Sequence, residues 1–213
     1  MMTPTNTVLD FNEVIHGRRT IKKYNPEVKI SREEMSQILK EATLAPSAFN
    51  LQPWRFVVIE SQDAKEKLLE IAPFNSTQVI TSSAVIAVFG DLEFANRADE
   101  IYGRAVELGH MPQEIKEKIL STVVPLFDSF SVQEKRESVM VDGGLVTMQL
   151  LLTAYAHGYA TNPMSGFNKE KIAEAFGLDA TRYIPIVIIS IGKAADEGRP
   201  PVRLPIDDIT QWK

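Results

Sequence analysis

The sequence contains no cysteine in its 213 residues, which excludes disulfide bonds, thiolate metal sites and cysteine nucleophiles. It also lacks a strong excess of one charge: its formal net charge is -5, so a general affinity for nucleic acid is not expected. No run reaches the ~18 apolar residues of a membrane span, and the N-terminus has no apolar stretch of signal-peptide length. We therefore expect a soluble, cytoplasmic protein without nucleic-acid or membrane partners.

Several catalytic motifs are absent as well. The three histidines form no HExxH pair, no GxGxxG follows a predicted strand, and neither a GxSxG elbow nor a Walker loop is present. These absences argue against zinc hydrolysis, a Rossmann dinucleotide site and a serine hydrolase. Within a long apolar segment, Asp142 and His157 are interpreted first as cap or surface residues, and Gly143 and Gly144 as sites of close helix packing.

The apolar residues that are present follow helical and strand periods. Ser31 and Glu34 predict a capping box at one helix start, and Pro46 ends that helix. Together the elements predict one α+β domain over residues 1–213, a mostly buried sheet flanked by helices. Helices are predicted at 8–17, 31–45, 65–72, 138–158 and 168–177, and strands at 55–60, 82–91, 159–161 and 183–193. Residues 93–136 are a possible helical excursion from the domain, broken at Pro112 and Pro125.

A cluster of basic residues follows the first predicted helix. Arg18, Arg19, Lys22 and Lys23 fall within six residues beside the hydroxyl of Thr20, in an otherwise acidic protein. A solvated basic turn and an anion site are about equally good interpretations of this cluster alone. Arginine offers a planar fork to phosphate, which makes phosphate the natural ligand of the second interpretation. Another isolated basic residue, Arg203, stands in the proline-rich C-terminal tail.

A polar loop joins the second predicted helix to the first predicted strand. Residues 45–60 read APSAFNLQPWRFVVIE, and three hydrogen-bonding side chains lie there between Pro46 and Pro53: Ser47, Asn50 and Gln52. Loops of this composition are often only turns. Its composition alone does not decide between a turn and a functional loop, and the answer depends on what else the chain carries.

Four stretches taken together resemble the nitroreductase family of flavin-dependent oxidoreductases. They are RRTIKKY, APSAFNLQPWRFVV, YATNPMSGF and GKAADEGRPPVRLP, in the family's order and at its spacing over nearly the whole chain. The resemblance implies a three-layer α-β-α fold with a mixed central sheet that is completed by the partner subunit's C-terminal tail, here residues 200–213. It also implies a homodimer with two FMN sites at the subunit interface.

The resemblance assigns FMN-binding roles residue by residue, and it names no catalytic side chain because the flavin carries the chemistry. Gln78 stands where relatives often have lysine, Ser165 replaces an acidic residue of some members, and Pro201 replaces a second phosphate-binding lysine. The implied positions are Arg18, Arg19, Thr20 and Arg203 at the phosphate, Lys22 at the pyrimidine end, Asn75 and Gln78 at the pyrimidine edge, Pro163, Met164, Ser165 and Gly166 against the reactive flavin nitrogen, and Pro46, Ser47, Ala48 and Asn50 facing the flavin of the partner subunit.

The activity implied by the resemblance is hydride transfer from NAD(P)H through bound FMN to nitroaromatic, quinone or similar small-molecule acceptors, by a ping-pong mechanism. Two alternatives stay open at this point. One is a flavoenzyme of the same fold with other chemistry, such as reductive dehalogenation or oxidation of a biosynthetic intermediate. The other is a non-catalytic flavin-binding protein. Neither the physiological acceptor nor the choice between NADH and NADPH follows from the sequence.

Overall fold

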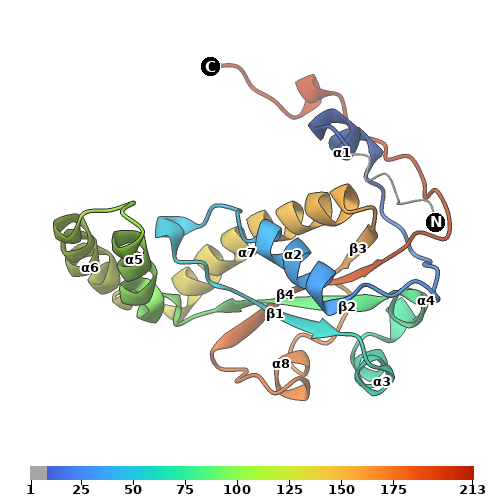
Figure 1. Ribbon diagram of the computed structural model, residues 1–213, viewed down its shortest axis with the longest axis horizontal. Helices are drawn as coiled ribbons and strands as arrows, with labels where there is room; N and C mark the ends of the chain where they lie inside the picture. Colours follow the sequence, from blue (N-terminus) through green and yellow to red (C-terminus); the bar gives the residue numbers. More distant parts are fainter. Residues whose placement is uncertain (1–8) are drawn as a thin grey trace.

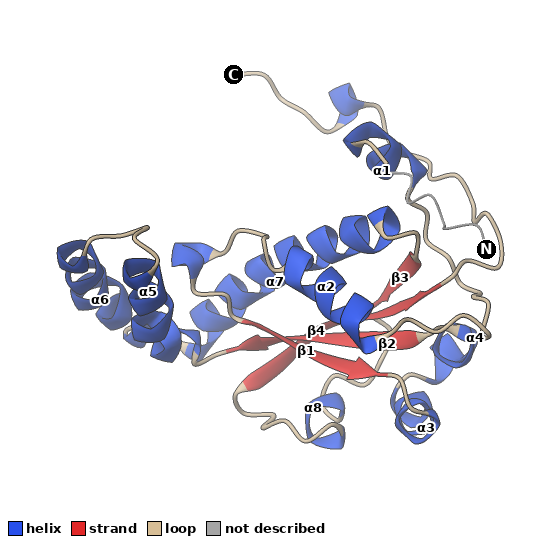
Figure 2. Ribbon diagram, in the orientation of Figure 1, coloured by secondary structure: helices blue, strands red, loops and turns tan. Residues whose placement is uncertain are grey.

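The computed structural model describes residues 9–213 and has three layers, with one sheet between two layers of helices (Figure 1). Helices α2 and α7 cover one face of the sheet, and α3, α4 and α8 lie on the other side (Figure 2). Each interface is filled by its own cluster of buried apolar side chains. The expected α+β fold with an α-β-α arrangement is therefore confirmed.

The helices and strands take their bounds from local signals that the sequence carries. Serine residues begin three of the helices, because each serine side chain accepts a hydrogen bond from the backbone three positions later. The helices are α1 (Phe11–Gly17), α2 (Arg32–Ala42), α3 (Gln62–Ile71), α4 (Ser76–Thr81), α5 (Ala98–Glu107), α6 (Gln113–Asp128), α7 (Val132–Ala156) and α8 (Ile172–Ala175), and the strands are β1 (Trp54–Ile59), β2 (Ala84–Asp91), β3 (Ala160–Met164) and β4 (Tyr183–Gly192).

The sheet has the strand order β1-β2-β4-β3, and all its pairings are antiparallel. We expected a mixed sheet, but within residues 9–213 the one parallel pairing is the isolated bridge between Thr20 and Thr161. Strand β2 lies in the middle and is buried along its whole length. Its side chains alternate between the two faces, so Ile86 and Val88 meet α2 and α7 while Val85 and Ala87 meet the opposite layer.

Several predicted helix boundaries differ from the structure. The predicted start at residue 8 lies outside the described residues. Ser31 caps α2, but the carboxylate of Glu34 accepts a hydrogen bond from the Tyr159 hydroxyl and does not complete the capping box. Helix α6 continues through Pro125, where we expected a break, because its side chains Val123 and Phe127 on either side are buried. Helix α8 is much shorter than the 168–177 segment that we expected.

Helix α7 packs against the sheet through a glycine. A β-bulge leaves Ile186 of β4 without a partner on β2, and its side chain lies against Gly143 so closely that a Cβ at this position would overlap Ile186 Cδ1. Gly143 therefore confirms the expectation of close packing. Gly144 does not, because nothing lies within 4 Å of the point that a Cβ would occupy there, and the residue faces outward.

Helix α7 is also the one helix in residues 9–213 that is long and apolar enough to cross a membrane by length and composition. Of its most apolar stretch, 44% is buried inside the protein. Asp142 and Gly143 lie on the buried face, and Val146 and Leu150 complete it as part of the core against the sheet. The apolar residues on this buried face therefore belong to the core of the protein.

Helices α5 and α6 form a pair that projects from one end of the three layers (Figure 1). They enclose a third apolar cluster, which includes Tyr102, Val123 and Phe127 and reaches Val139 of α7 and Leu51 of the loop before β1. Ser131 begins α7 with a capping box to Glu134, so the excursion ends sooner than residue 136. The pair is joined to the remaining chain by this cluster.

Gly143→Ala tests the packing of α7 on β4. We expect a lower free energy of unfolding by about 1–3 kcal/mol, because the added methyl overlaps Ile186 in a packed core. Gly103→Ala in α5 is the matched control: its Cβ would meet only the end of the Lys116 side chain, and alanine favours the helix by up to about 1 kcal/mol. Denaturant unfolding of both variants measures this, and equal stabilisation by the two alanines would contradict the proposed contact.

Candidate functional site

The segment after α1 is fixed to the edge of the sheet. Thr20 forms a bridge to Thr161 of β3, and the Ile21 amide donates to the Thr161 carbonyl at 3.2 Å. Ile21 and Tyr24 are buried, and the Tyr24 hydroxyl bonds to the Ser190 hydroxyl at 2.8 Å. Because Ile21 and Tyr24 are buried, the residues around them, including Arg18 and Lys22, are held beside the outer edge of strand β3.

The C-terminal segment returns across the same surface. Gly198 has a φ of 67°, and a Cβ there would lie 2.7 Å from Ile21 Cδ1 and 3.2 Å from Arg19 Cβ. Glycine is needed at position 198 for two reasons: the left-handed backbone conformation and the close approach of Ile21 and Arg19. This contact brings Arg199 and Arg203 to the N-terminal basic segment, although the two segments are far apart in the sequence.

The two segments enclose a cavity of about 700 Å³. Five basic side chains and two acidic ones line it, so its charge is positive in a protein whose overall charge is negative. The basic residues are Arg18, Arg19, Lys22, Arg199 and Arg203, and the acidic residues are Asp196 and Glu197.

In the described part of the chain, the arginines of the cavity lack carboxylate partners. Within residues 9–213, none of Arg18, Arg19 or Arg203 forms a salt bridge. Arg19 donates to the carbonyls of His16 and Arg18, which holds its guanidinium in place. Burial, followed by the positive charges of Arg203 and Arg19, lowers the pKa of Arg18. Like charges held together in this way favour the binding of an anion.

A second group of predicted residues meets at the far end of β3. The Asn75 side-chain amide donates to the Gly166 carbonyl at 2.8 Å, which joins the turn before α4 to the turn after β3. Gln78 on α4 is 9% exposed and makes no side-chain hydrogen bond within the described residues. The Tyr24 amide donates to Thr81 Oγ1 at 3.2 Å and links α4 to the basic segment. Strand β3 thus lies between the two groups.

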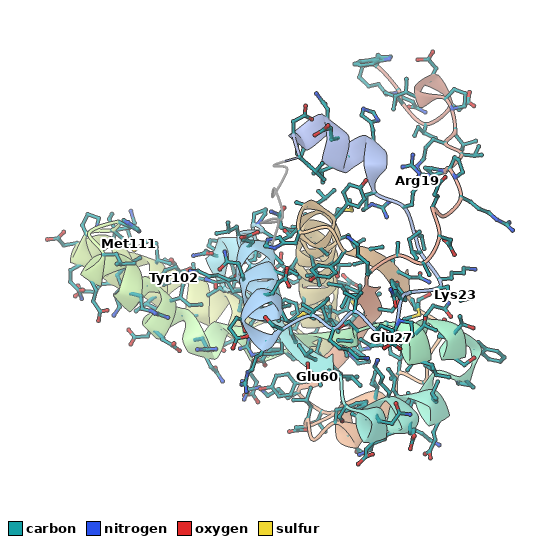
Figure 3. The ribbon with its side chains drawn as sticks, turned by 45° about the vertical axis from the view of Figure 1, so that its right-hand side comes forward. Arg19, Lys23, Glu27, Glu60, Tyr102 and Met111 are labelled. Carbon is teal, nitrogen blue, oxygen red and sulfur yellow. The ribbon has the colours of Figure 1, made fainter. Side chains whose placement is uncertain are left out.

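The loop of residues 46–52 lies elsewhere. It does not line the basic cavity, and Figure 3 shows Tyr102, which contacts this loop, and Arg19 in widely separated parts of the molecule. Three non-glycine residues of the loop have left-handed backbone conformations, with φ values of 50° at Phe49, 54° at Asn50 and 47° at Gln52. Such conformations are costly for residues with a Cβ and persist only when the surroundings impose them.

Side chains from three helices hold this loop. Both carboxylate oxygens of Asp142 in α7 accept from the Ala48 amide, at 3.1 and 3.2 Å. The Tyr102 hydroxyl of α5 donates to the Phe49 carbonyl at 2.7 Å, and the Phe127 ring of α6 meets the Phe49 ring edge to face. Within the loop, the Ser47 hydroxyl accepts from the Gln52 amide at 3.0 Å.

The predicted site residues lie in two regions of one chain: the two groups on either side of β3, and the separate loop of residues 46–52. The structure also adds residues that the sequence did not indicate. Arg199 lines the cavity beside Pro201, where we had noted a missing cation. Asp142 is 4% exposed, so its interpretation as a surface residue was wrong; an acidic residue in an apolar helix was the available signal. His157 pairs with Glu41 at 2.9 Å as expected of a surface residue.

Comparisons with known proteins identify the family of the chain. The family model described as Nitroreductase family matches residues 15–193. A Bacillus subtilis (strain 168) protein named as a candidate NAD(P)H nitroreductase, YdgI, is 58% identical over 204 residues, which are 96% of this chain and 98% of that protein. An enone reductase of conjugated linoleic acid (CLA) biosynthesis from Lactiplantibacillus plantarum is 38% identical, over 88% of this chain and 87% of that protein.

Solved structures give the same result. The crystal structure of a candidate nitroreductase in complex with FMN from Exiguobacterium sibiricum superposes with a TM-score of 0.95. Its sequence is 52% identical, and the match covers 97% of this chain and 99% of that chain.

Asp142→Asn tests the buried carboxyl group. Burial raises the pKa of Asp142 above its ordinary value of 3.8, although the hydrogen bond from the Ala48 amide opposes this, so the group binds a proton more readily in the folded than in the unfolded chain. The stability that this group contributes is full below the unfolded pKa and is lost as pH rises through the folded pKa. The asparagine variant lacks this titration, so wild type should gain stability relative to the variant as the pH falls from about 7 to about 4.

Denaturant unfolding of both proteins over this range gives the difference directly, because the other carboxyl groups are common to both. A difference that does not change with pH would show that Asp142 does not titrate as its burial indicates.

Proposed function

The chain belongs to the nitroreductase family, and we propose that it is an FMN-dependent oxidoreductase that uses NAD(P)H to reduce nitroaromatic, quinone or similar acceptors. The observation that carries the proposal is the positive cavity, whose arginines have no carboxylate partners among residues 9–213. Its chemistry suits a phosphate monoester, and its volume of about 700 Å³ is in the range of small-molecule sites. The solved relative from Exiguobacterium sibiricum holds FMN.

The phosphate of FMN would be held by the basic cluster. Arg18 and Arg203 supply guanidinium groups from opposite ends of the chain, Arg19 adds a third, and Thr20 offers a hydroxyl. Burial lowers the pKa of Arg18 most, and repulsion from Arg203 and Arg19 lowers it further; an anion placed among them would offset that repulsion. Arg199 supplies positive charge on the same cavity as Pro201, in compensation for the missing lysine.

The flavin ring would extend along β3 towards the second group of residues. Among residues 9–213 the side-chain oxygen of Asn75 has no hydrogen-bond donor, while its amide nitrogen bonds to Gly166, and Gln78 offers both donor and acceptor at the pyrimidine edge. Lys22 would supply positive charge there. The amide groups of Ser165 and Gly166 make no hydrogen bond in residues 9–213, so either is available to a ring nitrogen.

When bound, FMN supplies the redox chemistry, in which a hydride arrives from NAD(P)H and the reducing equivalents leave to the acceptor in a ping-pong cycle. The chain's own residues position the reactants. Lys22 stabilises negative charge that develops on the ring, and the free amide groups of residues 165 and 166 donate to the reacting region. No acid–base pair is required of the chain for such positioning.

A homodimer would complete the site. Apolar side chains are exposed on α1, on the outer face of α7 and along the tail, more than a soluble monomer normally leaves in water. The tail runs away from its own sheet (Figure 1), and a partner chain would bury it. The partner would also bring its loop of residues 46–50 to the flavin. The exposed residues are Phe11, Ile15, Val141, Leu145, Met148, Val202, Leu204, Ile206, Ile209 and Trp212.

The same site could serve other acceptors. Similarity to the Lactiplantibacillus plantarum enone reductase favours a conjugated enone as a second acceptor class. NAD(P)H oxidation by the purified protein, measured separately with a quinone, a nitroaromatic compound and an enone, decides among them. A protein that binds FMN but oxidises neither nicotinamide with any acceptor would be a flavin-binding protein only. Because NADH and NADPH are internal metabolites, we place the enzyme in the cytoplasm.

Arg18→Ala tests the phosphate site. We expect FMN binding to weaken about 10- to 100-fold, because a charge-assisted hydrogen bond contributes roughly 1.5–3 kcal/mol. Lys23→Ala is the control, since this exposed lysine is a near neighbour but does not line the cavity. Riboflavin lacks the phosphate and should bind both variants as it binds wild type. Flavin fluorescence titrations measure the affinities, and an equal loss for riboflavin and FMN would exclude a phosphate contact of Arg18.

Deletion of residues 204–213 tests the dimer separately from the charge of Arg203. The deletion removes Leu204, Ile206, Ile209 and Trp212, whose burial would contribute about 25 cal/mol per Å² of apolar surface. We expect weaker dimers and lower FMN retention, because a ligand of the assembled site stabilises assembly. Asn50→Ala should change flavin properties in an intact dimer. Sedimentation decides, and a truncated chain that remains a tight dimer with full FMN occupancy would refute the exchange of the tail.

A further inference from the structure

Helices α5 and α6 have no role in the function proposed above, yet both contact one short turn. The Tyr102 hydroxyl on α5 donates to the Phe49 carbonyl at 2.7 Å. The Phe127 ring on α6 lies 5.7 Å from the Phe49 ring, at an angle of 85°. Asp142 on α7 accepts from the backbone amide of the preceding residue, Ala48. Three helices thus converge on two consecutive residues of the loop before β1.

These contacts hold two residues at positive φ, against the preference of non-glycine residues for negative φ. Phe49 and Asn50 both have positive φ, and a single turn of three residues has few hydrogen bonds of its own to keep them there. The Asn50 and Leu51 amides bond back to the carbonyls of Ser47 and Ala48 at 3.0 Å. Without the Tyr102 hydroxyl, the turn would lose one of the contacts that hold Phe49 and Asn50 at positive φ.

The side chains held in this way face outward. Phe49 is 52% exposed although it is fixed at its carbonyl and at its ring, and Asn50 is exposed beside it. Tyr102, by contrast, is 4% exposed, and its hydroxyl is committed to the loop. The buried groups therefore fix a surface whose own residues are left available to another molecule.

We propose that Tyr102 and Asp142 are positioning residues that hold the loop of residues 47–52 in the shape that meets the flavin of the partner chain. This inference rests on the proposed function, because it takes the loop to face FMN. It gives the helix pair α5–α6 a function: through its contacts with this loop, the pair influences the affinity and the reduction potential of the flavin.

Tyr102→Phe is the direct test, since it removes only the hydroxyl that donates to Phe49. We expect FMN to bind about three- to tenfold more weakly, the fold-change of one lost neutral hydrogen bond, with a shifted flavin reduction potential and absorption spectrum. Tyr159→Phe is the matched control. Its hydroxyl also donates at 2.7 Å, but to Glu34 on α2, so it should change stability without changing the flavin.

Asp142 provides a second, independent comparison. Asp142→Asn keeps an oxygen that can accept from the Ala48 amide, whereas Asp142→Ala leaves that amide without an acceptor. We expect the flavin potential and FMN affinity of the asparagine variant to stay near wild type and those of the alanine variant to change. Equal changes in the two Asp142 variants, or equal effects of Tyr102→Phe and Tyr159→Phe on the flavin, would overturn the positioning role.

The experiments distinguish a failure of the proposed function from a failure of this inference. Wild-type protein that takes up no FMN refutes the flavin site itself. Wild-type protein that binds FMN, with Tyr102→Phe showing the same affinity, potential and spectrum, leaves the flavin site standing and removes Tyr102 from it.

Discussion

The packing of α7 on the strand pair β2–β4 is the constraint on which the other features of the molecule depend. Three consecutive residues of this helix face three directions. Asp142 holds the loop before β1, Gly143 admits Ile186 of the sheet, and Gly144 faces outward among exposed apolar side chains. A shift of the helix by the width of a methyl group would therefore move the loop and the outward face together. Close packing makes such a shift costly, which keeps both in place.

In the basic cavity, by contrast, the interactions among the chain's own arginine side chains are unfavourable. Arg18 is half buried beside Arg19 and Arg203 without a carboxylate partner among the described residues. Backbone contacts keep the arginines together: the bridge of Thr20 to β3 on one side and the contact of Gly198 with Ile21 on the other. The fold thus maintains a repulsion that a bound anion would relieve, as is common at functional sites.

Local signals made much of this fold predictable. The apolar runs of β2 and β4 and the serine caps indicate the layers, because each depends on residues close in the sequence. The two halves of the basic cavity are about 180 positions apart, and the family's motifs, not a local signal, bring them together. The roles of Tyr102 and Asp142 could not be predicted in this way. Their partners lie 53 and 94 positions away, and either residue would be ordinary on a helix surface. Pro125 misled us for the same reason, since the packing that keeps α6 intact around it is tertiary.

The division of the site between two regions of one chain has a physical consequence. A loop that must meet a flavin in another chain cannot be shaped by that flavin during folding, so its strained conformation has to be imposed by its own chain beforehand. Residues 48–50 are supported accordingly, by hydrogen bonds to α5 and α7 and by an aromatic contact to α6. Preorganisation of this kind removes an ordering cost from the binding step, where it would weaken both the dimer and the cofactor complex. If the loop meets the flavin of a partner chain as proposed, the helix pair α5–α6 is a structural requirement of that site, even though it lies far from the basic cavity.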